Sequence, residues 1–252
     1  ALEALDPVLE AGQKQERTTV EVLDDLLTRE RDTRFERRVA TNLKLSGIAH
    51  ARTLESFDFE AEVDVSKQLI QELATLRFLH QSENVLFLGP PGVGKSHLAI
   101  GLGLKAIEQG HRVYFITLHD LVDRSRLARQ RDRLHHLSNT VTRPDLLVLD
   151  EVGYLPLEQM DATFLFQVVS RRYEAGKPII LTSNKSYGSW QDIFPDPILA
   201  TALLDRLLDQ STTVNIRGES YRLRHRRQAG LSSGEEKDRP RPNRRKCPIR
   251  NR

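Results

Sequence analysis

The stretch LFLGPPGVGKSHLA, residues 86–99, constrains the fold of this chain more than any other part of its sequence. An apolar run ends abruptly in a turn of glycines and prolines, and an amphipathic run follows at once. Gly89 and Gly94 bracket four residues ahead of Lys95 and Ser96, which is the G-x-x-x-x-G-K-[ST] spacing of a loop that wraps a triphosphate. We therefore predict a buried strand, a phosphate-binding loop and a helix that begins at the loop.

Each residue type in this loop suits a polyanion. Glycines let backbone N–H groups converge on the anion, the lysine reaches the β- and γ-phosphates, and the serine hydroxyl can bind Mg²⁺. The helix that follows directs the positive end of its dipole at the same place. The alternative is a glycine-rich turn without a ligand. The predicted nucleotide ligands in this stretch are Gly89, Pro90, Pro91, Gly92, Val93, Gly94, Lys95, Ser96 and His97.

Composition limits the class of protein. The chain has 252 residues, of which 38% are hydrophobic, enough for one core domain and a smaller appendage. No apolar run approaches the ~18 residues that cross a bilayer, and the first residues lack the pattern of a secretory signal. We expect a cytoplasmic protein without a membrane partner. Because Cys247 is the single cysteine, any metal site must use oxygen ligands.

The chain divides into three parts. Residues 1–58 repeat apolar residues at helical spacing between dense charges, which predicts a small helical N-terminal region. Residues 59–228 alternate short apolar runs with amphipathic ones, which predicts an α/β core with a mainly parallel five-stranded sheet flanked by helices. The expected strands are NVLFLG, HRVYFIT, DLLVLDE, KPIILTSN and TTVNI. Residues 229–252, rich in Arg, Pro, Ser and Gly, are expected to be a basic disordered tail.

Two carboxylates follow the apolar run LLVL. Asp150 is expected at the carboxyl edge of the sheet, beside the phosphate-binding loop, where it can hold Mg²⁺ directly or through water. Glu151, the next residue, can polarise a water for in-line attack on the γ-phosphate. An acidic helix cap is the alternative for this pair. Because the sequence also contains the phosphate-binding loop, the catalytic role of the two carboxylates is favoured over a helix cap.

Three further residues are candidates for the same site. Asn184 ends another apolar strand and can orient the attacking water, although an ordinary turn residue is the alternative. Arg206, inside LLDRLLD, can stabilise transition-state charge on the γ-phosphate, or pair with a neighbouring Asp as a structural ion pair. Arg222, in GESYRL, is a second candidate for a nucleotide contact.

Two arginine clusters are candidate DNA contacts. One lies near the N-terminus and includes Arg34, Arg37 and Arg38. The other crowds a helical stretch between the second and third strands. Since Asp and Glu are interspersed, a solvated helix face with i,i+4 ion pairs is the alternative for both. Few aromatic residues accompany them, which favours phosphate contacts on duplex DNA over stacking on single strands. In the second cluster, the residues predicted to contact DNA are Arg126, Arg129 and Arg131.

With these residues in place, the chain resembles an AAA+ P-loop ATPase, and specifically the IstB family of insertion-sequence transposition helpers. The resemblance spans roughly residues 15–230 and is most specific in DEVGYLPL and GESYRL. It implies that Lys95 and Ser96 bind ATP·Mg²⁺ and that Asp150 and Glu151 form the Walker B pair. It also implies the roles of sensor 1, arginine finger and sensor 2 for Asn184, Arg206 and Arg222.

The family resemblance implies a bacterial ATPase that forms an oligomer on duplex DNA and helps a partner transposase to select its target site. An arginine finger supplied by a neighbour would place ATP between subunits, in a head-to-tail ring or helix. Helicase loaders of the DnaC type resemble the same core and are the alternative. A third hypothesis is a nucleotide-gated DNA-binding scaffold that hydrolyses ATP negligibly.

Overall fold

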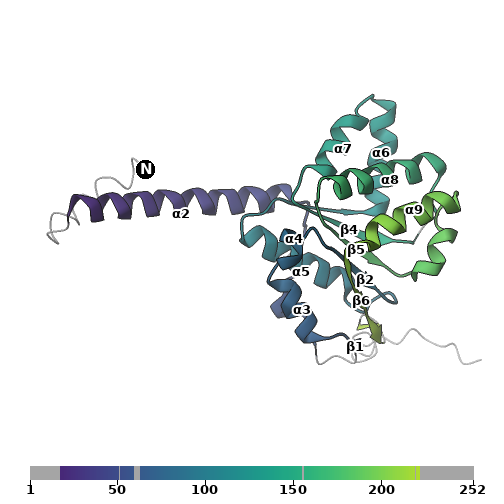
Figure 1. The fold of residues 1–252 in the computed structure, drawn as a ribbon, viewed down its shortest axis with the longest axis horizontal. Helices are drawn as coiled ribbons and strands as arrows, with labels where there is room; N and C mark the ends of the chain where they lie inside the picture. Colours follow the sequence, from purple (N-terminus) through teal and green to yellow (C-terminus); the bar gives the residue numbers. More distant parts are fainter. Residues whose placement is uncertain (1–17, 51, 60–62, 155, 219, 222–252) are drawn as a thin grey trace, which may run out of the picture.

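A parallel sheet of five strands forms the centre of the computed structural model, which describes residues 18–50, 52–59, 63–154, 156–218 and 220–221 (Figure 1). The strand order is β3-β4-β5-β2-β6, and every neighbouring pair is parallel. All five strands that the sequence predicts are confirmed. They are β2 (Asn84–Leu88), β3 (Val113–Thr117), β4 (Leu146–Val152), β5 (Ile179–Ser183) and β6 (Ser211–Asn215).

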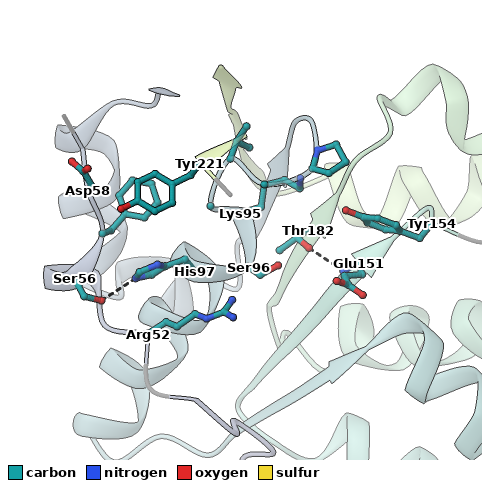
Figure 2. Close-up of a pocket in the computed structure, with 15 residues that line it drawn as sticks. Arg52, Ser56, Asp58, Lys95, Ser96, His97, Glu151, Tyr154, Thr182 and Tyr221 are labelled. Atoms are coloured by element: carbon teal, nitrogen blue, oxygen red, sulfur yellow. Dashed lines mark hydrogen bonds between the residues drawn. The ribbon is translucent and has the colours of Figure 1, made fainter. Parts of the chain in front are cut away.

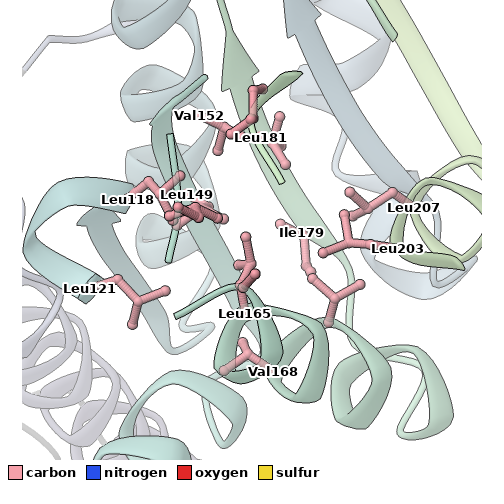
Figure 3. Packing of buried hydrophobic residues seen from close by; sticks show 14 of the residues in the cluster. Leu118, Leu121, Leu149, Val152, Leu165, Val168, Ile179, Leu181, Leu203 and Leu207 are labelled. Atoms are coloured by element: carbon pink, nitrogen blue, oxygen red, sulfur yellow. The ribbon is translucent and has the colours of Figure 1, made fainter. Parts of the chain in front are cut away.

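Helices cover both faces of the sheet, and they bury its inner strands β2 and β5 along their whole length. One face packs Leu149, Leu181 and Leu165 with other apolar residues, as Figure 3 shows. The other face packs Phe87 and Leu102. The helices of the core are α3 (Lys67–Ala74), α4 (Arg77–His80), α5 (Lys95–Glu108), α6 (Leu118–Gln130), α7 (Leu134–Thr142), α8 (Gln159–Glu174) and α9 (Pro197–Leu208), with short 3₁₀ turns η1 (Leu54–Ser56) and η2 (Tyr187–Asp192).

In the described part of the N-terminal region, the long helix α2 (Thr19–Leu45) extends away from the core (Figure 1). Thr18 begins it with a capping box shared with Glu21. Its C-terminal end is fixed to the core, where Asn42 Nδ2 donates hydrogen bonds of 3.1 Å to two backbone carbonyls after α5. The predicted helical N-terminal region is thus confirmed as a projecting arm.

A second, two-stranded antiparallel sheet joins β1 (Val63–Asp64) to β7 (Arg217–Gly218). It ties the chain before α3 to the end of the core, a pairing that the sequence does not predict. The boundaries at 58 and 228 remain predictions, and the tail 229–252 lies outside the described residues. Within the described part of the chain, every helix is too short or too polar to cross a membrane.

Candidate functional site

The loop between β2 and α5 closes around the side chain of Lys95. This side chain is buried, and its Nζ donates hydrogen bonds of 2.7 Å to the carbonyl oxygens of both Gly89 and Pro90. The ammonium is therefore already held inside the loop that the sequence assigns to a triphosphate. Helix α5 begins at this lysine, so its N-terminal N–H groups face the same space.

Two glycines allow the loop to pack tightly. Gly94 has a φ of +94°, and a Cβ there would lie 2.5 Å from the ring of Phe57. Gly92 has a φ of +85°, and its carbonyl accepts a hydrogen bond of 3.1 Å from the backbone N–H of Tyr221. The loop is thus packed between segments from both ends of the core, and a side chain at either position would be strained.

A hydrogen-bonded chain crosses from the loop to the carboxyl ends of β4 and β5. Ser96 Oγ donates to Asp150 Oδ1 at 2.8 Å, and the hydroxyl of Thr182 donates to the same carboxylate oxygen. The backbone N–H of Glu151 donates to Thr182 Oγ1 at 3.0 Å. Asp150 is buried, whereas Glu151 is exposed to the cavity. The sheet brings both predicted carboxylates beside the loop.

The backbone at Glu151 has an uncommon conformation. Its φ is +62°, and the pairing of β4 with β5 shifts register between Leu149 and Val152. A left-handed conformation is unfavourable for a residue with a side chain, so the surrounding contacts must hold it. The bulge interrupts the strand alternation and leaves Glu151 exposed directly after the buried Asp150.

Asn184 follows β5 at the same edge of the sheet. Its Oδ1 is buried and has no hydrogen-bond partner among the described residues. A Cβ on Gly153 would lie 3.2 Å from this oxygen, so the amide is close to the segment that follows Glu151. An unsatisfied buried acceptor is costly. It is suited to receive a hydrogen bond from a bound water.

Lys95, Ser96, Glu151 and Thr182 line a cavity of about 280 Å³ (Figure 2). Asp150 and Asn184 are not among its lining residues and lie at the adjoining edge of the sheet. Of the predicted ligands, residues 91–97 line the cavity, whereas Gly89 and Pro90 hold Lys95. Sequence reasoning missed several lining residues. The polar Thr182 inside an apolar strand was a usable signal, and so were the stretches DEVGYLPL and GESYRL, which contain Tyr154 and Tyr221. The others lie in a segment that carries no phosphate motif. The missed residues are Arg52, Ser56, Phe57, Asp58, Tyr154, Thr182 and Tyr221.

The oxygen ligands that Mg²⁺ prefers are present at this edge. Ser96 Oγ and Asp150 Oδ1 lie 2.8 Å apart beside the loop, and hydroxyl, carboxylate, water and phosphate oxygens are the usual magnesium ligands. The donor set of the site therefore fits the ion that the sequence predicts.

Arg206 is remote from this cavity in the single chain. It lies near the start of β2 and β5, at the amino edge of the sheet, beside Asn84 and Ile179. Its guanidinium carbon sits 4.7 Å from the ring centre of Phe166, and Nη1 donates to Ala202 O at 3.0 Å. Among the described residues, Arg206 forms no ion pair with Asp205 or Asp209. Arg222 lies outside the described residues.

The candidate DNA-binding arginines differ in their surroundings. Arg126 and Arg129 bind the buried carboxylate of Asp161 on α8 at 2.8 and 2.6 Å, so they form structural ion pairs between helices in place of the i,i+4 pairs of a solvated face. Burial raises the pKa of Asp161, but hydrogen bonds from these arginines outweigh it and hold the pKa below its usual value. The other four are Arg34, paired with Glu30, Arg38, placed over Phe35, and the exposed Arg37 and Arg131.

Comparison with known proteins decides the family. The sequence matches the family described as IstB-like ATP binding protein over residues 1–229. The chain belongs to this IstB-like family. It is 49% identical over 207 residues to the ATP-binding protein named for insertion sequence IS5376 of Geobacillus stearothermophilus, covering 82% of both chains. It is 44% identical to the IS21 ATP-binding protein of Pseudomonas aeruginosa, covering 90% of this chain and 85% of that one.

Solved structures with the same fold include replication proteins. The DnaC helicase loader superposes with a TM-score of 0.54 at 22% identity, covering 66% of this IstB-like chain and 96% of the loader. DnaA from Aquifex aeolicus bound to AMPPCP superposes with a TM-score of 0.55 at 22% identity, covering 73% and 57%. The IstB-like chain therefore shares its fold with these replication proteins, and this fold has the parallel five-stranded sheet flanked by helices that the sequence predicts.

Proposed function

We propose that this IstB-like protein hydrolyses ATP with Mg²⁺, assembles on duplex DNA and assists a transposase in selecting its target site. The observation that carries the ATPase is the hydrogen-bonded chain from Ser96 through Asp150 and Thr182 to Glu151, beside the buried Lys95. The proposed role beside a transposase is supported by the relatives, which are named for insertion sequences. A bacterial, cytoplasmic location goes with this role.

The residues of the cavity and of the adjoining sheet edge have distinct tasks in this proposal. Lys95 leaves the loop carbonyls and contacts the β- and γ-phosphates. Ser96 and Asp150 would hold Mg²⁺, which would neutralise phosphate charge. Glu151 accepts a proton from the water that attacks the γ-phosphorus, and the bond to the ADP oxygen breaks. Asn184 orients this water with its unsatisfied Oδ1.

Arg206 acts on the nucleotide of a neighbouring subunit in this proposal. Its place at the amino edge of the sheet keeps it away from the cavity of its own chain at the carboxyl edge. A head-to-tail contact between these two edges would form a ring or a helix. Each ATP then joins two subunits, and hydrolysis weakens the joint. Arg222 lies outside the described residues, and its contact with the nucleotide is a further proposal.

DNA is held through phosphate contacts in this proposal. The six candidates are Arg34, Arg37, Arg38, Arg126, Arg129 and Arg131. Arg37 and Arg131 are exposed and form no ion pair or ring contact with other described residues, so they are the preferred sites for a first test. Replacing each with Ala should weaken binding to all duplex sequences alike and reduce the slope of affinity against salt. An unchanged salt slope would exclude the residue from the interface.

The test of the ATPase uses two variants. Lys95→Ala should abolish ATP binding, whereas Glu151→Gln should bind ATP, lose phosphate release and remain assembled on DNA. Glu72→Gln, on the exposed side of α3, is the matched control and should behave as the wild type. Normal phosphate release by Glu151→Gln would remove the proposed base. Negligible release by the wild type, with or without DNA, would favour the nucleotide-gated scaffold.

A helicase loader is the second candidate function, because the DnaC loader shares the fold. A pull-down with the transposase and with the replicative helicase of the same host separates the two. We expect retention of the transposase. Retention of the helicase alone would reassign the protein.

A further inference from the structure

Arg52 is a cation in the cavity that no phosphate motif predicts. It lies between α2 and η1, and Figure 2 shows its guanidinium directed toward Ser96. Within the part of the chain that the structure describes, Arg52 makes no hydrogen bond or ion pair. Arginine carries its charge at any physiological pH and presents donors that match phosphate oxygens. It therefore has the chemistry of a ligand for a bound polyanion.

The segment that carries Arg52 is fixed to the phosphate-binding helix. His97 Nε2 lies 2.8 Å from Thr53 O and 3.1 Å from Ser56 Oγ. Leu54 is buried against α5, where a Cβ on Gly101 would lie 2.5 Å from its side chain. The backbone on one side of Arg52 is thus attached to the residue that follows Ser96, which places the arginine in a defined position relative to the cavity.

The other side of Arg52 leads to the projecting helix. The segment from Ser46 to Arg52 joins it to α2, and the carbonyl of Ser46 accepts a hydrogen bond of 2.7 Å from the backbone N–H of Phe115 on β3. A contact between Arg52 and a ligand would therefore restrain this segment at the point where the arm leaves the core. Among the described residues between the arm and η1, Arg52 alone lines the cavity.

The charge balance of the cavity favours an added cation. The side chains of Glu151 and Asp58 line it together with Lys95, and a nucleoside triphosphate brings several negative charges of its own. We propose that Arg52 binds the polyphosphate of the nucleotide within its own chain and orders the segment between α2 and η1 when the nucleotide is present. This inference rests on the proposed function of the cavity as an ATP site.

Binding is measured first, with AMPPCP and Mg²⁺ in a calorimetric titration so that hydrolysis plays no part. Arg52→Ala should weaken the affinity by about tenfold or more, as expected for the loss of a charge-assisted hydrogen bond, and Arg52→Lys should restore part of it. Arg77→Ala is the matched control, because Arg77 is exposed on α4 and outside the cavity. Equal affinities for Arg52→Ala and the wild type would overturn the proposal.

Hydrogen exchange separates a ligand contact from a merely structural role. At saturating AMPPCP, residues 46–56 should gain protection in the wild type and in Arg77→Ala. In Arg52→Ala the loop at residues 89–97 should still gain protection while residues 46–56 do not. Equal protection of both segments in Arg52→Ala would contradict the coupling. If the wild type does not bind AMPPCP, the assignment of the cavity as an ATP site is wrong. If the wild type binds AMPPCP and Arg52→Ala binds it with the same affinity, only this inference is refuted.

Discussion

Ser96 and Asp150 are 54 positions apart in the sequence, yet the serine hydroxyl donates a hydrogen bond of 2.8 Å to the carboxylate. Asp150 lies on β4, whereas Ser96 lies at the start of α5, which follows β2, and β5 separates β2 from β4. The gap is crossed by Thr182 on β5, whose hydroxyl donates to the same carboxylate oxygen. The site therefore depends on the middle strand as much as on the two strands that carry the predicted motifs.

Thr182→Val tests this dependence. The substitution keeps the shape of the side chain but removes the donor to Asp150 and the acceptor for the N–H of Glu151. We expect ATP hydrolysis to fall by about tenfold or more, the usual effect of misplacing a general base, with ATP binding largely kept. Thr213→Val on β6, whose hydroxyl contacts Tyr187, is the control and should hydrolyse ATP normally. Equal phosphate-release rates for both variants would show that Thr182 has no role.

Phe166→Leu tests the placement of Arg206. The ring lies under the guanidinium at 4.7 Å, so its loss should let the arginine adopt other rotamers. We expect a lower kcat for the assembled protein, by several-fold, with unchanged ATP affinity. In an Arg206→Ala background the same substitution should cause no further loss. Additive losses in the kinetic double-mutant cycle would show that Phe166 acts on another group.

Asp161→Asn tests the ion pairs that fix α6 to α8. Since the folded pKa of Asp161 lies below its unfolded value, the pairs stabilise the fold above about pH 4, and this contribution is lost as the pH falls through the folded pKa. The substitution should cost about 1–3 kcal/mol in the free energy of unfolding at pH 7, and less in acid. Asp192→Asn, at an exposed aspartate, is the control. A loss that is the same at pH 3 and pH 7 would contradict the assignment.

Arg172→Met tests a buried guanidinium that organises the chain around β4. Its two terminal nitrogens donate to five backbone carbonyls, and burial lowers its pKa to about 9, so it is charged at neutral pH. Removing it takes a donor from each of these carbonyls, of which those of Thr142 and Pro178 keep a second hydrogen bond, and should cost roughly 3–5 kcal/mol in denaturant unfolding. The exposed neighbour Arg171, changed to Met, should cost less than about 1 kcal/mol. Similar losses for both would refute the role.

Local patterns predict the strands and the loop well because each is encoded in a short stretch. The run before Gly89 is apolar throughout, as a strand buried on both faces must be, and β2 has this burial. The Lys95 and Ser96 spacing likewise determines a local geometry. Strand order is different, since it depends on which apolar surfaces pair across the whole chain. The place of β5 between β2 and β4 therefore had to come from the structure.

Partners distant in sequence explain the remaining differences. The pattern of the second arginine cluster allows i,i+4 pairs, but Arg126 and Arg129 instead reach Asp161 on another helix. In α2 the local expectation holds, since Arg34 pairs with Glu30. Arg52 could not be recognised because nothing near it resembles a phosphate motif, and only tertiary packing brings it to the cavity.

Sedimentation velocity of Glu151→Gln with ATP, Mg²⁺ and duplex DNA tests most directly whether nucleotide joins one copy of the chain to the next on DNA. The account predicts large assemblies that require ATP, and that disappear when Arg206→Ala is added. Single copies of the protein under all of these conditions would contradict it.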